Sequence, residues 1–194
     1  MKSHVYKIEK GAQVLDEILF ESEKVAKYND LDHKEALQLR LLSEELVNLL
    51  PSVVSNFSGE FWIENRDNYS ELCVSVSVED MDFDTRERLI KVSKNNKNAF
   101  VVGITGKIQA VFDYMVIDRN DPMISPAGKY GFSTNIDFSQ IWSLKEYQES
   151  VMAEKKARDA WDEFERSIIV KTADDVIVGV RGKKVSIIIK KTFA

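Results

Sequence analysis

The chain has few residues of the kinds that crosslink small proteins or bind zinc. Its 194 residues include one cysteine and two histidines. An intramolecular disulfide is therefore excluded, and the four-ligand zinc patterns built on cysteine and histidine have too few donors. We expect a reducing, cytoplasmic setting for such a chain.

Long apolar runs are also missing. No segment approaches the roughly 18 apolar residues of a membrane helix. The segment after the start contains Ile8-Glu9-Lys10-Gly11 and lacks the apolar region of a signal peptide. These absences predict a chain that neither spans a membrane nor has a membrane as its partner.

The charge balance argues against a nucleic-acid partner. The chain has 27 basic and 32 acidic side chains, which gives a formal net charge of −5, so its composition provides no general attraction to a phosphate backbone. With 44% hydrophobic and 30% charged residues over this length, residues 1–194 fit one globular domain with a real core.

Hydrophobic periodicity predicts helices in the first quarter of the chain. The pattern of Lys2–Lys10 fits either a short strand or a frayed terminus. A helix is expected over Val14–Lys27, which Asn29-Asp30 ends. Asp32 is the candidate N-cap of a second helix, and Glu35 stands three residues later, as in a capping box. Pro51 is expected to stop this helix after Leu50.

The remaining pattern is mostly that of strands. We expect a strand pair at 61–64 and 73–79, a short helix at 84–92, a helix over 104–115, a long loop at 117–143, a helix over 144–166 and terminal strands at 168–170, 176–180 and 185–189. This order predicts an α+β fold, a two-layer α/β sandwich with helices on one face of a mostly antiparallel sheet. The loop plus helix at about 116–166 is then an insertion.

The second helix has two faces with different compositions. At about 100° per residue, one face collects the leucines Leu39, Leu42, Leu46, Leu49 and Leu50, which predict its core contact. The opposite face combines Leu37 and Leu41 with Glu44 and Asn48. Because it mixes apolar and polar side chains, we expect something to cover it.

Glu44 and Asn48 are the candidate chemical residues. They are four positions apart, so they lie one turn from each other and present a carboxylate and an amide oxygen to the same space. Such a pair suits a magnesium-phosphate site, in which the amide oxygen ligates the ion and the carboxylate orients or deprotonates an attacking hydroxyl. By spacing alone, the pair is more typical of exposed polar residues on an amphipathic helix.

A resemblance favours the chemical interpretation. Leu42-Ser43-Glu44-Glu45-Leu46-Val47-Asn48 resembles the N-box of the GHKL-type ATPase superfamily of gyrases, heat-shock chaperones, histidine kinases and mismatch-repair proteins, and most of all the anti-sigma-factor serine kinases. A strand pair follows this segment. Val102-Gly103-Ile104-Thr105-Gly106-Lys107-Ile108, before an amphipathic helix, is similar to the second glycine box of that family. The resemblance spans roughly 5–115 and 168–193.

The resemblance implies a role for each matching residue. Asn48 would ligate magnesium, Glu44 would be the catalytic carboxylate, and Gly103 and Gly106 would let the backbone approach the phosphates of ATP. Asp80 or Asp82 would accept a hydrogen bond from the adenine amino group. The family's first glycine box should stand at 78–84, where this chain has acids but no glycine.

These observations leave different functions open. The first is an ATP- and magnesium-dependent regulatory protein that transfers a phosphoryl group to a hydroxyl of a partner protein. The second is a degenerate, non-catalytic member that acts as a protein–protein interaction module. A third is a small-molecule-binding domain, which a closed, apolar cleft beside Leu41 and Asn48 would favour. The mixed-charge helix around Glu149–Asp159 predicts a solvated face, with a dimerisation helix, and thus a homodimer, as the alternative.

Overall fold

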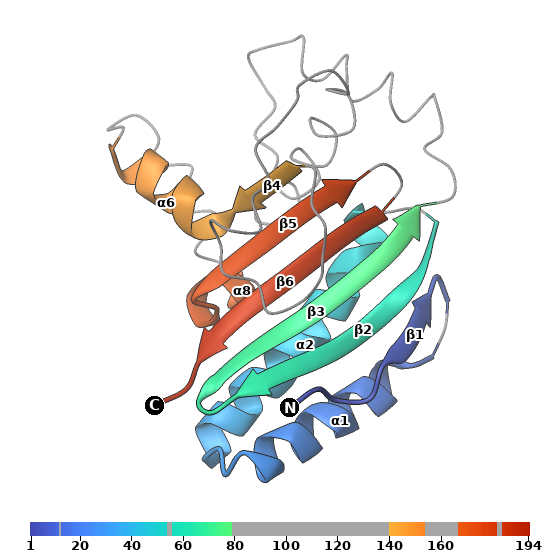
Figure 1. Ribbon diagram of the computed structural model, residues 1–194, viewed down its shortest axis with the longest axis vertical. Coiled ribbons are helices and arrows are strands. Elements are labelled where there is room, and N and C mark those ends of the chain that lie inside the picture. Colours follow the sequence, from blue (N-terminus) through green and yellow to red (C-terminus); the bar gives the residue numbers. More distant parts are fainter. Residues whose placement is uncertain (12, 54–55, 79–139, 154–166, 182–183) are drawn as a thin grey trace, which may run out of the picture.

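A six-stranded antiparallel sheet with helices on one of its faces makes up the described part of the chain (Figure 1). The computed structural model describes residues 1–11, 13–53, 56–78, 140–153, 167–181 and 184–194. The elements are β1 (Tyr6–Glu9), α1 (Leu15–Tyr28), α2 (His33–Val53), β2 (Phe57–Arg66), β3 (Tyr69–Val78), β4 (Gln140–Ser143), α6 (Leu144–Ala153), α8 (Ile168–Thr172), β5 (Asp175–Arg181) and β6 (Lys184–Thr192). The predicted α+β fold is confirmed, with the strand order β1-β2-β3-β6-β5-β4.

Helix α1 ends where the sequence predicted, at Asn29 and Asp30. Asp30 adopts a left-handed φ of 53°. Its N–H donates to the carbonyl of Lys27, and the N–H of Leu31 donates to the carbonyl of Ala26 at 3.0 Å. This is the Schellman pattern, in which two otherwise unpaired carbonyls at the helix end accept hydrogen bonds.

Helix α2 begins with the predicted capping box and ends later than predicted. The N–H of Glu35 donates to Asp32 Oδ1 at 2.8 Å, and the N–H of Asp32 donates to Glu35 Oε2 at 2.9 Å. The expected stop at Pro51 is wrong, because the helix continues through Pro51 to Val53. In the last turn a proline removes a single intrahelical donor, so the helix can end just beyond it.

The strand pairing corrects two other predictions. The hairpin β2–β3 and the hairpin β5–β6 are present, and β3 pairs with β6 in the middle of the sheet. The segment 168–170, expected as a strand because its residues are β-branched or apolar, is instead the start of helix α8, whose Ile169 is buried. The strand next to β5 is β4, which lies in the segment expected to be loop. Packing against neighbours has overridden local propensity at both places.

Some predicted segments cannot be compared with the structure. The predicted helices at 84–92 and 104–115 and most of the loop at 117–143 lie outside the described residues. The predicted helix 144–166 is present as α6 as far as Ala153, beyond which the chain is again not described up to Ser167.

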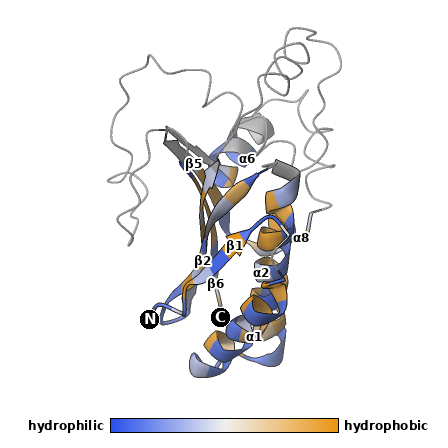
Figure 2. Cartoon of the chain, turned by 90° about the vertical axis from the view of Figure 1, so that its right-hand side faces the viewer, coloured by the Kyte–Doolittle hydropathy of each residue, from blue (hydrophilic) through white to orange (hydrophobic). Residues whose placement is uncertain are grey.

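The main core lies between the sheet and the helices α1, α2 and α8. Figure 2 shows the apolar sides of α1 and α2 directed at one face of the sheet. The leucines of α2 pack there with inward-facing strand residues, which include Phe61, Ile63, Leu72, Val74, Val76, Val178, Ile187 and Ile189. The predicted leucine stripe is confirmed, since its five members are between 0% and 6% exposed.

A second, smaller cluster lies on the opposite face of the sheet. Trp62, Cys73, Ile177 and Ile188 are buried there. Register places Trp62 beside Cys73, Cys73 beside Ile188, and Ile188 beside Ile177, so they form one row across four strands. The sheet thus has apolar side chains on both faces. Among the described helices, none is long and apolar enough to cross a membrane.

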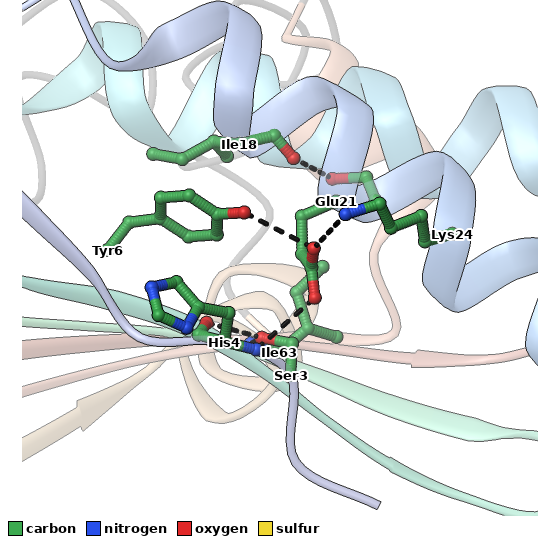
Figure 3. A network of polar contacts seen from close by, with 8 residues as sticks. Ser3, His4, Tyr6, Ile18, Glu21, Lys24 and Ile63 are labelled. Carbon is green, nitrogen blue, oxygen red and sulfur yellow. Dashed lines mark hydrogen bonds and ion pairs between the residues drawn. The ribbon is translucent and has the colours of Figure 1, made fainter.

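A polar network joins the N-terminal segment to α1 (Figure 3). Glu21 is 9% exposed. It accepts hydrogen bonds from the backbone N–H of His4 and the hydroxyl of Tyr6, each at 3.2 Å, and from the Lys24 ammonium group at 3.3 Å. Burial acts to raise the pKa of Glu21, but these donors outweigh it and leave the pKa below its ordinary value.

The lowered pKa predicts a loss of stability in acid. The contribution of Glu21 is fully present above the ordinary carboxyl pKa of 4.5 and is lost as the pH falls through the lower folded value. Glu21→Gln should therefore lower the free energy of unfolding by about 2 kcal/mol at pH 7. The difference in free energy of unfolding between wild type and variant should become smaller in acid. Urea unfolding at pH 7 and pH 3 measures this, with the exposed Glu60→Gln as control. A difference that becomes larger in acid would contradict this role of the Glu21 carboxylate.

Strands β2 and β3 approach closely at Gly59. A Cβ built on Gly59 would lie 2.2 Å from the carbonyl oxygen of Ser75 and 2.6 Å from Cα of Val76. Gly59→Ala should thus force the strands apart and lower the free energy of unfolding by about 1–3 kcal/mol. The neighbouring exposed Ser58→Ala should change it by less than about 0.5 kcal/mol. Equal midpoints for the two variants in thermal unfolding would refute the close approach.

Candidate functional site

The face of α2 opposite its buried leucines carries the predicted chemical residues. We call Leu37, Leu41, Glu44 and Asn48 the outer face of α2. Leu37 is 48% exposed, Asn48 is exposed, and Leu41 and Glu44 are half-buried. The prediction that something covers this face is therefore wrong at Leu37 and Asn48. The leucine face on the other side of the helix is held by the sheet, so the outer face is held in a fixed orientation.

Glu44 and Asn48 are one helical turn apart on this outer face, as their spacing predicted. Within the described ranges, neither side chain has a hydrogen bond or ion pair. Their oxygen atoms are therefore available to a ligand. Helix α2 runs from His33 to Val53, so both residues lie well inside a continuous helix and not at a frayed end.

A pocket of about 500 Å³ opens where the last turns of α2 meet the end of β1 and the start of α1. Its apolar wall is formed by Ile8, Val14, Leu15, Val47, Leu50 and Phe57. This volume is within the range of small-molecule sites, about 300–1,000 Å³. The pocket lies on the helical side of the sheet, next to β1.

Only one of the two candidate residues lines the pocket. Asn48 lines it, whereas Glu44 and Leu41 do not. Glu9, Gln13 and Asp16 are its other polar lining residues. The cleft beside Asn48 is therefore partly polar and does not reach Leu41.

The described residues provide only some of the ligands that a magnesium ion needs. Across the described ranges, no group of three or more His, Cys, Asp or Glu side chains is positioned to hold a metal ion. Magnesium bound with a nucleotide takes much of its coordination from phosphate and water and needs only one or two protein ligands. The amide oxygen of Asn48, with the carboxylate of Glu44 one turn away, fits that limited requirement.

The other predicted site residues cannot be placed. Asp80, Asp82, Gly103 and Gly106 lie outside the described residues. Of the predicted site, the structure thus describes the helix that carries Glu44 and Asn48.

Two titratable groups, the buried Cys73 and the half-buried Tyr69, lie on the opposite face of the sheet. Burial, with the nearby charges of Glu71 and Glu64, raises the pKa of the Cys73 thiol well above its ordinary value. Burial and the charge of Glu71, to which Tyr69 donates a hydrogen bond at 2.9 Å, raise the pKa of Tyr69. A thiol that stays protonated is a poor nucleophile, so this cluster has a packing role.

Sequence reasoning did not find the pocket. Its lining comes from β1, the loop before α1, the start of α1, the last turns of α2 and the start of β2. Gly11, with a φ of 86°, is the one local signal, because a glycine between a strand and a helix indicates a sharp turn. That signal predicts a change of direction and gives no information about the residues brought together.

Comparison of the chain with protein-family models, with curated proteins and with solved structures finds no match. A function therefore has to be inferred from the residues and geometry of this chain.

The exposure of the outer face predicts that its residues can be changed without loss of the fold. Glu44→Ala and Asn48→Ala should each alter the free energy of unfolding by less than about 0.5 kcal/mol. Leu46→Ala, on the buried face of the same helix, should cost about 2–5 kcal/mol. Urea unfolding of the three variants measures this. A loss above 2 kcal/mol for Asn48→Ala would mean that its side chain has a structural role.

Proposed function

We propose that the chain is an ATP-binding regulatory protein that resembles the anti-sigma-factor serine kinases. The observation that carries the proposal is the pair Glu44 and Asn48, one turn apart on the outer face of α2, with no partners among the described residues and with the helix anchored by its leucines. A carboxylate and an amide that are held in place and left available suit the recognition of a magnesium-bound phosphate.

The order of the elements supports this proposal. The resemblance implied a helix carrying Glu44 and Asn48, a strand pair after it and terminal strands that complete a sheet. The structure has β1, α1, α2 and the hairpin β2–β3 in this order, with β6 paired to β3 and β5 paired to β6. The helices lie on one face of that sheet (Figure 2).

Within this proposal each residue has a defined task. Asn48 ligates magnesium through its amide oxygen, and the ion supplies charge neutralisation for the phosphates. Glu44 accepts the proton of the hydroxyl group on a partner protein that receives the phosphoryl group. Asp80 or Asp82 binds the adenine amino group, and Gly103 and Gly106 allow the backbone to approach the phosphates.

One observation favours a second candidate, a non-catalytic protein–protein interaction module. Leu37 is 48% exposed on the same outer face, next to the half-buried Leu41. An exposed leucine beside a half-buried one suits contact with a partner protein or with a second copy of the chain. The segment 78–84 also has no glycine, so the flexible wall that the resemblance implies for a nucleotide is missing there.

Calorimetry separates the two candidates. Titration of the purified chain with ATP and with ADP, each with magnesium, should give a dissociation constant in the micromolar range, about −8 kcal/mol. Asn48→Ala should abolish the heat because it removes the proposed ligand of the ion. Glu44→Gln should retain binding, since it keeps the shape of the side chain and removes only the proposed base.

Glu60→Gln is the matched control, because it removes one exposed carboxylate on β2, on the side of the sheet opposite to the helices. It should bind ATP as wild type does. If wild type gives no heat and no thermal shift at millimolar nucleotide, the kinase proposal is wrong and the interaction module is favoured. If Asn48→Ala binds as tightly as wild type, nucleotide does not use the outer face of α2.

A further inference from the structure

The pocket between β1, α1 and α2 is an opening at the edge of the main core. Ile8, Leu50 and Phe57 line it and are themselves buried residues of that core. Val14 and Val47 also line it, and they are half-buried and pack against the same core cluster. Protein interiors are normally close-packed. An opening of about 500 Å³ bounded by core residues therefore leaves apolar surface that a bound molecule can remove from water.

The two acidic residues of the lining do not give the pocket a charge. Glu9 follows the inward-facing Ile8 on β1, and alternate residues of a strand face opposite sides of the sheet. Its carboxylate is therefore directed to the face opposite to α1 and α2. Asp16 is exposed on α1, on the side away from buried residues of that helix such as Ile18 and Val25. Among the lining residues that the structure describes, no charged side chain is directed into the pocket.

The start of α1 also adds little charge to the pocket. No side chain caps this helix, whose N-cap is Val14, and a helix N-terminus is equivalent to about half a positive charge. Asp16 and Glu17 are acidic residues in its first turn and offset that charge. A charged ligand would therefore exchange water for an apolar wall without gaining an opposite charge from the described lining, which is unfavourable.

The neutral polar residues of the lining suit an uncharged ligand. Gln13 and Asn48 line the pocket and are exposed. A side-chain amide can both donate and accept hydrogen bonds. A hydroxyl or amide group on a ligand can therefore keep a hydrogen-bond partner when the rest of the molecule covers the apolar wall.

The volume of the pocket limits the size of its occupant. An α-helix is about 10–12 Å wide with its side chains and rises about 5.4 Å per turn, so a single turn would already fill a pocket of about 500 Å³. Small-molecule sites have volumes of about 300–1,000 Å³. The pocket therefore suits a small molecule better than a helix of a partner protein.

We propose that this pocket binds a small uncharged molecule that has an apolar body and one polar group. The apolar body covers Val14, Val47 and the adjoining edge of the core. The amide of Gln13 or Asn48 forms a hydrogen bond with the polar group. This inference does not depend on the binding of nucleotide.

Three probes with the same two-ring body and different charge test this proposal. 2-Naphthylmethanol is the neutral probe, 2-naphthylmethylammonium the cation and 2-naphthoate the anion. Each is titrated into the ¹⁵N-labelled full chain without nucleotide or magnesium, and the amide signals of Gly11, Gln13 and Val47 are followed. The neutral probe should bind at least about tenfold more tightly than either ion, and added salt should not weaken its binding.

Substitutions of Val47 test whether the probe lies in the pocket. Val47→Phe places a larger side chain in the opening and should raise the dissociation constant of the neutral probe at least about tenfold. Val47→Thr keeps the shape of the wall but adds a hydroxyl group, and should raise this constant about threefold. Ile168→Phe, at a position that is 38% exposed on α8 and outside the pocket, is the matched control and should leave it unchanged. Urea unfolding checks the fold of each variant, and Val47→Thr provides the test if Val47→Phe does not fold.

Four results would overturn the proposal. The first is no shift of the pocket signals at millimolar neutral probe. The second is binding of either ion as tight as that of the neutral probe, which would mean that the pocket does not favour an uncharged ligand. The third is unchanged binding in every folded Val47 variant. The fourth is displacement of the neutral probe by ATP with magnesium, which would make the pocket part of the nucleotide site.

Failure of the nucleotide proposal would be seen separately. The probe titrations contain neither ATP nor magnesium, so an absence of heat in the ATP calorimetry would leave their outcome unaffected. Conversely, a chain that binds ATP through Asn48 but gives no shifts with the neutral probe would retain the nucleotide proposal and lose this one.

Discussion

The contact between the leucine face of α2 and the sheet determines the orientation of everything else that bears on function. Leu39, Leu42, Leu46 and Leu50 are 0% exposed. A helix turns by about 100° per residue, so shifting the buried stripe by a single position would turn Glu44 or Asn48 toward the core. Burying leucine favours the observed orientation by about 1.5–3 kcal/mol for each side chain. The availability of Glu44 and Asn48 is thus a consequence of hydrophobic packing on the other side of the helix.

A second constraint sets the distance between the two long helices. The hydroxyls of Ser22 and Ser43 are hydrogen-bonded at 2.8 Å, and both residues are 0% exposed. Small side chains at this contact let α1 lie close to α2 without leaving buried polar atoms unpaired. Glu21, next to Ser22, holds the N-terminal segment on α1. Together these contacts bring the start of α1 and the end of β1 to the last turns of α2, which is where the pocket lies.

The parts of this fold that could be predicted are those decided by neighbours in sequence. The capping box of Asp32 and Glu35 and the leucine stripe of α2 follow from spacings of three and four residues. The short elements could not be predicted, because four or five residues carry too little periodicity. Ile168–Val170 has the residues of a strand, yet its contact with α2 holds it in a helix. Strand β4 becomes a strand only through its pairing with β5.

The same distinction applies to the sites. Glu44 and Asn48 could be proposed from the sequence because they lie on one helix, where a separation of four residues fixes their relation in space. The pocket could not, because Glu9, Asp16 and Asn48 are brought together only by packing. These two regions meet at Asn48, which belongs to both.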